Sequence, residues 1–213
     1  MARITVIGGT GYAGAAIVAE AAERGHEVTA VSRHEPSAPV PGVTYVRGSA
    51  LDEVVRSRAF DNADVVVTAT SPRGDMAHQH VQLAEALASR AGATGVPLVV
   101  IGGFSSLRPA PDAPRFIEGD VPAEYRYEAL AGHSILEMLR AEPEELQWTF
   151  VSPAATFGAF APGDTTGSYR LGGEVAQFDS EGTSYISAGD LAKAVVDIIE
   201  SGDLRREHVS VIG

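Results

Sequence analysis

The stretch Arg3–His34, RITVIGGTGYAGAAIVAEAAERGHEVTAVSRH, decides how this chain begins to fold. Its apolar run Ile4–Ile7 is typical of a buried strand, and the alanine-rich segment from Tyr12 to Arg24 predicts a helix that ends before Gly25. A second strand is expected from His26 to Ser32. A strand, a glycine-rich turn, a helix and a further strand form one unit of an α/β fold with a parallel sheet.

The same alternation continues along the chain. Further strands are expected at 44–47, 64–68, 97–101, 147–151 and 208–212, with short strands near Tyr169 and Tyr185, and further helices at 76–91, 123–140 and 190–200. This order predicts a doubly wound parallel sheet, the Rossmann-type α/β fold, with helices on both faces of the sheet.

The composition is that of a soluble globular protein, with 45% hydrophobic and 21% charged residues. No apolar run approaches the roughly 20 residues needed to cross a bilayer, and no secretory signal pattern opens the chain. The formal net charge of −12 argues against nucleic acid or a membrane as the main partner, because binding phosphates needs clustered Lys and Arg. The chain has no cysteine, which excludes disulfides, and we expect a cytoplasmic protein.

Glycines at positions 8, 11 and 14 follow the first strand and open the first helix. In this context the three glycines suit the binding of a dinucleotide pyrophosphate. Gly8 permits a tight turn, Gly11 lets the backbone come close to the phosphate, and Gly14 lets the helix pack on the strand. The spacing is G-x-x-G-x-x-G rather than G-x-G-x-x-G. Cofactor binding is therefore expected at Gly8, Gly9, Thr10, Gly11, Tyr12, Ala13 and Gly14.

The end of the second strand indicates which dinucleotide is bound. An NAD site usually has Asp or Glu there for the ribose 2′-hydroxyl, whereas this chain has Ser32 and Arg33 and no acid before Glu35. A guanidinium and a hydroxyl suit a 2′-phosphate, so NADP(H) is favoured over NAD(H). The alternative for Arg33 is a solvated surface residue.

Six segments in order, VIGGTGYAG, EVTAVSR, DVVVTAT, LVVIGGFSSL, WTFVSPAATF and ISAGDLAKAV, resemble the atypical short-chain dehydrogenase/reductases. The chain is most similar to their NmrA-like NAD(P)H-binding branch, often called NADH-flavin reductases, and is more distantly similar to flavin reductase/biliverdin reductase B. The resemblance covers essentially the whole chain. The length and the order of elements predict a single domain over 1–213, with a nucleotide-binding core at 1–152 and a substrate-side cap, last helix and last strand at 153–213.

One departure from this family pattern concerns the reaction. Typical members use a Tyr-x-x-x-Lys pair, in which the tyrosine is the acid and the lysine lowers its pKa. In this chain Tyr125 and Tyr127 are each followed four residues later by alanine. The only lysine is Lys193. Alcohol dehydrogenation is therefore disfavoured, and FMN, FAD or a similar conjugated acceptor, to which the protein need only align a nicotinamide ring, suits the chain better.

The resemblance also implies which residues surround the reacting groups. Cofactor contacts are implied at Ala69, Thr70, Ser71 and Pro72, at Gly102 and Gly103, and at Pro153 and Ala154. Catalytic positions are implied at Ser105, Ser106 and Tyr127, with Tyr125 as the alternative hydrogen-bond donor. Phe104 could form a wall, and Arg73 is either a partner for substrate or phosphate or an exposed loop cation. No metal site is expected, because His78 and His80 are two residues apart on a helix and do not face each other.

Three functions are compatible with these patterns. The first is an NADPH-dependent reductase of a small-molecule acceptor, the second a non-catalytic NmrA-like redox sensor, and the third an isomerase of the nucleotide-sugar epimerase type. The loops 103–122 and 158–173 are long enough to act as lids, but they equally suit a rigid scaffold or a dimer contact. Both a monomer and a homodimer remain open. Ser187–Asp190 is interpreted as a helix N-cap.

Overall fold

The protein forms one sheet of eight strands, seen in a computed structural model that describes all 213 residues except the side chain of Asp75. The strands are β1 (Arg3–Ile7), β2 (Glu27–Ser32), β3 (Thr44–Arg47), β4 (Val65–Thr68), β5 (Leu98–Ile101), β6 (Trp148–Pro153), β7 (Arg170–Gly172) and β8 (Glu207–Ile212). They are ordered β3-β2-β1-β4-β5-β6-β8-β7, and all pair in parallel except β7 with β8. The predicted doubly wound fold is confirmed.

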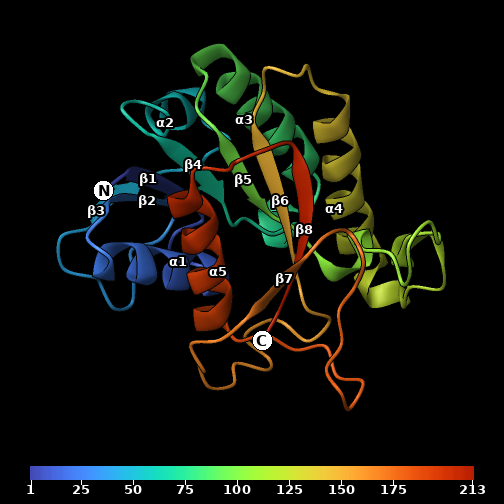
Figure 1. The fold of residues 1–213 in the computed structure, drawn as a ribbon. Coiled ribbons are helices and arrows are strands. Elements are labelled where there is room, and N and C mark those ends of the chain that lie inside the picture. Colours follow the sequence, from blue (N-terminus) through green and yellow to red (C-terminus); the bar gives the residue numbers. More distant parts are fainter.

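Helices cover both faces of the sheet (Figure 1). One face carries α1 (Tyr12–Glu23) and α5 (Ala188–Ser201), and the other carries α2 (Glu53–Arg58), α3 (His80–Thr94) and α4 (Ala123–Ala141). Single turns of 3-10 helix, η1 (Gly74–Met76), η2 (Phe104–Ser106) and η3 (Phe116–Glu118), lie in the loops after β4 and β5. The two helical layers therefore leave the carboxyl edge of the sheet to its loops.

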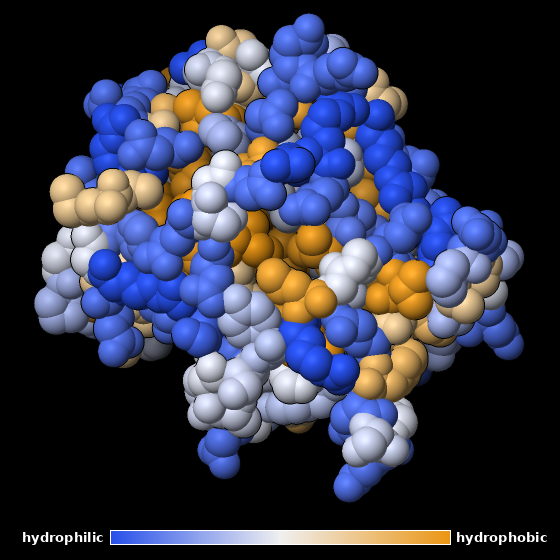
Figure 2. Space-filling view, in the orientation of Figure 1, coloured by the Kyte–Doolittle hydropathy of each residue, from blue (hydrophilic) through white to orange (hydrophobic). Residues whose placement is uncertain are grey.

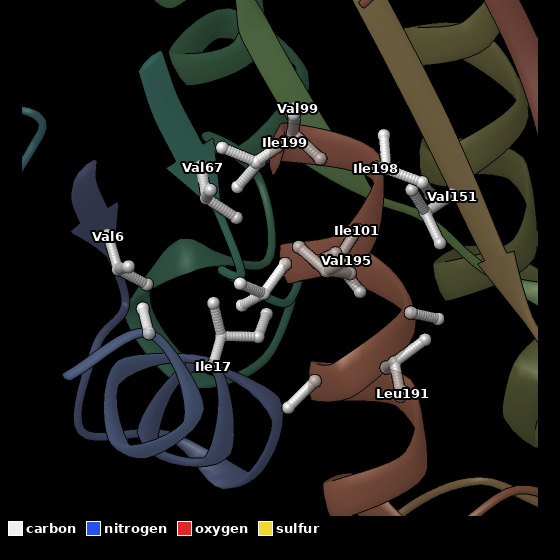
Figure 3. Packing of buried hydrophobic residues seen from close by; sticks show 14 of the residues in the cluster. Val6, Ile17, Val67, Val99, Ile101, Val151, Leu191, Val195, Ile198 and Ile199 are labelled. Atoms are coloured by element: carbon white, nitrogen blue, oxygen red, sulfur yellow. The ribbon is translucent and has the colours of Figure 1, made fainter. Parts of the chain in front are cut away.

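The core consists of two apolar layers, one on each face of the sheet. Figure 3 shows the first layer, where Val6 and Val67 from the sheet point toward Ile17 of α1 and Val195 of α5. All of these side chains are buried, because strands in the middle of a doubly wound sheet are covered on both faces. This packing fixes the strands whose ends carry the candidate site.

Some element boundaries differ from the sequence-based expectation. The short helix α2 was not predicted, although Asp52 caps it by accepting hydrogen bonds from the backbone N–H groups of Val54 and Val55. The expected helix start at Met76 was wrong, because η1 and a turn precede α3. The expected strand near Tyr185 is a single bridge to Thr156.

The face of the protein seen in Figure 2 is covered mostly by hydrophilic side chains, with hydrophobic ones visible between them near its centre. None of the helices in the described part of the chain combines the length and apolar character that a membrane span requires.

Candidate functional site

The candidate site lies where the strand order reverses. From β1 the chain continues to β2 and β3 on one side, whereas β4, β5 and β6 lie on the other side. The crevice at the carboxyl ends of the strands beside such a switch point is where open parallel sheets bind ligands. Gly8, Ala69 and Gly102 directly follow β1, β4 and β5, so three predicted segments meet at this edge.

The glycine turn after β1 requires its glycines. Gly8 has a φ of +82°, in the left-handed region, and a Cβ added there would lie 2.8 Å from the carbonyl oxygen of Ala69. A Cβ on Gly14 would lie 2.2 Å from the carbonyl oxygen of Gly8, so α1 can approach the turn only with glycine at this position. Gly11 is the N-cap of α1 and provides no capping side chain. The first N–H groups of α1 therefore lack a side-chain acceptor, and the helix end suits an anion.

A first hollow of about 400 Å³ opens between this turn and the ends of β2 and β3. Its lining includes the predicted residues Gly8, Thr10, Gly11, Ser32, Arg33, Ala69, Thr70 and Ser71. The hydroxyls of Thr10 and Ser32 lie 2.5 Å apart, which ties the glycine turn to the end of β2. The lining also includes Glu35 and Ser49, which were not predicted.

A second hollow of about 240 Å³ continues from the first, and both are lined by Gly11 and by Ala69, Thr70, Ser71 and Arg73. It adds the predicted residues Tyr12, Ala13, Pro72, Gly102 and Gly103. Gly9 and Gly14 line neither hollow; they are buried beneath the turn.

His80 is a part of the second hollow that was not predicted as a site residue. Its Nε2 lies 3.2 Å from the carbonyl oxygen of Thr70, to which it donates. Burial lowers the pKa of His80, so the imidazole is held in its neutral form. The hydroxyl of Thr70 also contacts that of Thr68 at 3.1 Å. His80 thus anchors the loop after β4 against the end of that strand.

A third hollow of about 480 Å³ adjoins the second, and the two share Arg73, Gly102, Gly103, Glu128, Gly132 and Phe157. It contains the predicted residues Ser105, Ser106, Pro153 and Ala154. Aromatic rings form much of its wall, namely Phe104, Phe116, Tyr125, Phe157 and Phe160. The rings of Phe104 and Phe116 are 4.8 Å apart and tilted by 32°. Such a wall suits a flat, conjugated molecule.

Helix α4 turns one face toward the third hollow. Tyr125, Glu128, Ala129 and Gly132 are spaced as the residues of one helical face, and all four line the hollow. Tyr127, which was predicted as catalytic, lies outside the lining and contacts the carbonyl oxygen of Ala77 and the ring of His78. The structure therefore places Tyr125, rather than Tyr127, at the third hollow, because residues two apart on a helix point in different directions.

The predicted serines differ in their access to the third hollow. Ser105 is half-buried, whereas Ser106 is only 1% exposed. Beneath them, the hydroxyl of Ser152 donates to the carbonyl oxygen of Gly103 at 2.9 Å and lies 2.9 Å from Nε2 of His208. The loop that begins at Gly103 is therefore held from below by two buried side chains that sequence reasoning did not identify.

The loop 103–122 is fastened to the body of the protein. Arg115 is 3% exposed, and its guanidinium donates to the carbonyl oxygen of Ser106 at 2.5 Å and to Glu174 at 2.5 Å. Hydrogen bonds from Arg115 and Arg140 outweigh burial and lower the pKa of Glu174 to about 2, so the carboxylate stays ionised. These contacts make the loop a scaffold for Ser106 and Phe116.

The loop 158–173 is fastened at two points. The carbonyl oxygen of Pro162 accepts hydrogen bonds from the hydroxyls of Tyr12 and Tyr185, at 3.3 and 3.0 Å. The buried carboxylate of Asp190 accepts from the backbone N–H groups of Thr166 and Gly167. Asp190 donates its own N–H to the hydroxyl of Ser187, which confirms the predicted N-cap.

A parallel sheet with a glycine turn at its switch point and adjoining hollows along its carboxyl edge defines a dinucleotide-binding protein of the Rossmann class. The chain belongs to the NAD(P)H-binding family, whose family model matches residues 8–202. The resemblance inferred from the sequence motifs is thereby confirmed.

Individual proteins are similar to this chain over its full length. The uncharacterized protein YwnB of Bacillus subtilis is 33% identical over 99% of this chain and 98% of its own length. The structure of a putative NADH-flavin reductase from Streptococcus pneumoniae has 32% identity and a TM-score of 0.88, covering 100% of this chain and 99% of its own. The structure of a putative epimerase from Bacteroides thetaiotaomicron has 29% identity and a TM-score of 0.86, covering 99% of this chain and 96% of its own.

Proposed function

We propose that the protein is an NADPH-dependent oxidoreductase that reduces a flavin or a similar flat, conjugated acceptor. The observation that carries this proposal is the continuity of the three hollows from the glycine turn to a wall of aromatic rings. A cofactor held along the first two hollows and an acceptor held in the third would meet at the residues that the second and third hollows share.

The cofactor fits the residues that are present. The uncapped N-terminus of α1 and the turn at Gly8 suit the pyrophosphate, and Ser32 with Arg33 suits a 2′-phosphate. When bound, NADPH would supply the hydride. On the nicotinamide side, Gly102, Pro153 and Ala154 would orient the ring through backbone groups, and loop 158–173 would help to exclude water.

The missing Tyr-x-x-x-Lys pair supports a flavin-type acceptor over an alcohol or ketone. Lys193 lies on α5, in the helical layer that packs against α1, whereas Tyr125 lies on α4 on the other face of the sheet. A flat acceptor needs alignment more than an activated tyrosinate, because solvent can supply its proton. In this proposal Phe104 and Phe116 align the acceptor, Ser105 donates a hydrogen bond to it, and buried Ser106 supports the loop.

Oxidation of NADPH by the purified protein tests this proposal. The nicotinamide absorbance would be followed with FMN, riboflavin and a set of quinones, each against a blank without protein. We expect oxidation well above the blank for at least one of these acceptors. Rates equal to the blank with all of them would reject the reductase proposal. A cytoplasmic location goes with this proposal, because the reduced cofactor is available there.

A second candidate function is an epimerase-like isomerisation. The third hollow contains Asp120 and Tyr125, which are groups able to exchange a proton, and one structural relative carries an epimerase name. An epimerase would leave the absorbance of the cofactor unchanged over a full reaction while the substrate is converted into its stereoisomer. Net oxidation of NADPH without formation of a stereoisomer would favour the reductase.

A further inference from the structure

The lining of the third hollow carries more negative than positive side chains. Arg73, Asp120 and Glu128 are the charged side chains among its described lining residues. Arg73 is paired with Glu128, with an N–O distance of 3.0 Å. Asp120 makes no hydrogen bond or ion pair with any other residue described in the structure. The hollow therefore presents one uncompensated carboxylate and an arginine that is already partnered.

Two arginines near this hollow, Arg108 and Arg115, are not available to a ligand in it. Arg115 is 3% exposed and bound to Ser106 and Glu174, and Arg108 donates to the carbonyl oxygen of Ala113 and lies 3.4 Å from Glu174. Recognition of a phosphate needs a guanidinium, an ammonium or several converging N–H groups. The arginine side chains of the loop 103–122 are therefore bound to other protein groups and do not face an acceptor in the hollow.

The remaining lining of the hollow is neutral. Five aromatic rings and small residues at the ends of β5 and β6 and on α4 make up most of it, with the hydroxyls of Ser105 and Tyr125 as polar groups. This surface favours a flat apolar body with a few hydrogen-bonding atoms. A phosphate or sulfonate attached to that body would enter the net negative field of Asp120, Glu128 and Arg73, and like charges within a Debye length repel each other.

On the basis of the function proposed above, we propose that Asp120 and Glu128 make the third hollow selective for acceptors without an anionic group. The substrate class is then a neutral, flat, conjugated molecule, such as a quinone or an unphosphorylated isoalloxazine. Phosphorylated flavins are the disfavoured members of the same chemical class. The NADPH phosphates are assigned to the glycine turn and Arg33, and Asp120 lines neither the first nor the second hollow.

Riboflavin and FMN form the matched pair that tests the selectivity, because they share the isoalloxazine ring and differ by one phosphate. At low ionic strength we expect the KM for FMN to exceed that for riboflavin by about five-fold, and high salt should narrow this difference. Asp120→Asn and Glu128→Gln should each lower the ratio of the two KM values. Asp112→Asn changes an exposed aspartate of the same loop outside the hollow and should leave the ratio unchanged.

Flavin binding, measured by fluorescence quenching with NADP⁺ present, separates this proposal from the reductase proposal. Tighter binding of riboflavin than of FMN, without turnover of any flavin or quinone, would support the selectivity and reject the reductase. Equal or tighter binding of FMN, binding of neither flavin, or an unchanged preference in Asp120→Asn would overturn the selectivity.

Discussion

The imidazole Nε2 of His208 lies 2.9 Å from the hydroxyl of Ser152, and both side chains are buried between β6 and β8. Because the Ser152 hydroxyl donates to the carbonyl oxygen of Gly103, His208 must donate its Nε2 proton to Ser152. The chain of donors runs from β8 through β6 to the loop after β5. It fixes the backbone at the junction of the second and third hollows without reaching the ligand space itself.

This arrangement predicts that the stability of the protein falls in mildly acidic solution. Burial, with Arg115 and Arg140 nearby, lowers the pKa of His208 to about 3, whereas an unfolded histidine titrates near 6.5. As the pH falls below the unfolded pKa, the unfolded chain binds a proton that the folded one does not. The free energy of unfolding should therefore decrease by about 2 kcal/mol between pH 7 and pH 5 on account of His208.

Urea unfolding of the wild type and His208→Gln at several pH values would measure this contribution. The variant should lose stability at pH 7 and show a shallower pH dependence, since the lowered pKa values of His80 and His133 still contribute. Ser152→Ala is the matched control, because it removes the hydrogen bond but keeps the buried imidazole. If the free energy of unfolding of His208→Gln depends on pH as steeply as that of the wild type, this histidine does not cause the acid sensitivity.

The second prediction concerns the glycine turn. Gly14→Ala should abolish dinucleotide binding, because its Cβ would lie 2.2 Å from the carbonyl oxygen of Gly8 and displace either α1 or the turn. Gly92→Ala is the control: it lies exposed within α3 with no atom near its added Cβ, and it should stabilise the protein by about 1 kcal/mol. Calorimetric titration with NADPH and thermal unfolding would measure both effects. Normal binding by Gly14→Ala would contradict the role given to the turn.

Sequence reasoning succeeded where the structure depends on local pattern. The turn at Gly8, the helix after it and the strands from β1 to β6 follow from apolar periodicity and glycine position, which act over a few residues. The same reasoning predicted that the segments after β1, β4 and β5 lie at one edge of the sheet, since parallel strands end on the same side of a sheet.

Features that depend on contacts between distant segments could not be predicted in this way. Arg115 and Asp120 lie in the same proline-containing loop, yet one is buried against Glu174 and the other lines the third hollow. The choice between Tyr125 and Tyr127 depends on the rotation of α4 about its axis, which its neighbours determine. The spacing of Tyr125, Glu128 and Gly132 was the available signal for the correct face.

The third prediction tests which dinucleotide the first hollow prefers. Arg33→Ala should weaken NADPH binding by about 1–3 kcal/mol and leave NADH binding nearly unchanged, because only NADPH carries the 2′-phosphate. Titrations with both cofactors would measure the difference, with Arg126→Ala, an exposed arginine of α4 outside the hollows, as the control. Equal weakening of both cofactors would mean that Arg33 does not read the 2′-phosphate.

The last prediction concerns the buried guanidinium that holds the wall of the third hollow. Arg115→Met leaves the carbonyl oxygen of Ser106 without its donor and removes one of the arginines around Glu174. The Glu174 side chain is 38% exposed and keeps Arg140 at 2.7 Å, so we expect a loss of about 1–3 kcal/mol, mainly from the buried carbonyl oxygen of Ser106 left without its donor.

Stability and kinetics together separate a local role of Arg115 from general unfolding. Arg115→Met should raise the KM for the acceptor through movement of Ser106 and Phe116, while the Kd for NADPH, set at the distant glycine turn, stays the same. Arg205→Met, at an exposed arginine paired only locally with Asp203, should change neither quantity. A rise in both the acceptor KM and the cofactor Kd would show that Arg115 stabilises the protein as a whole, whereas unchanged stability would show that the buried contacts contribute little.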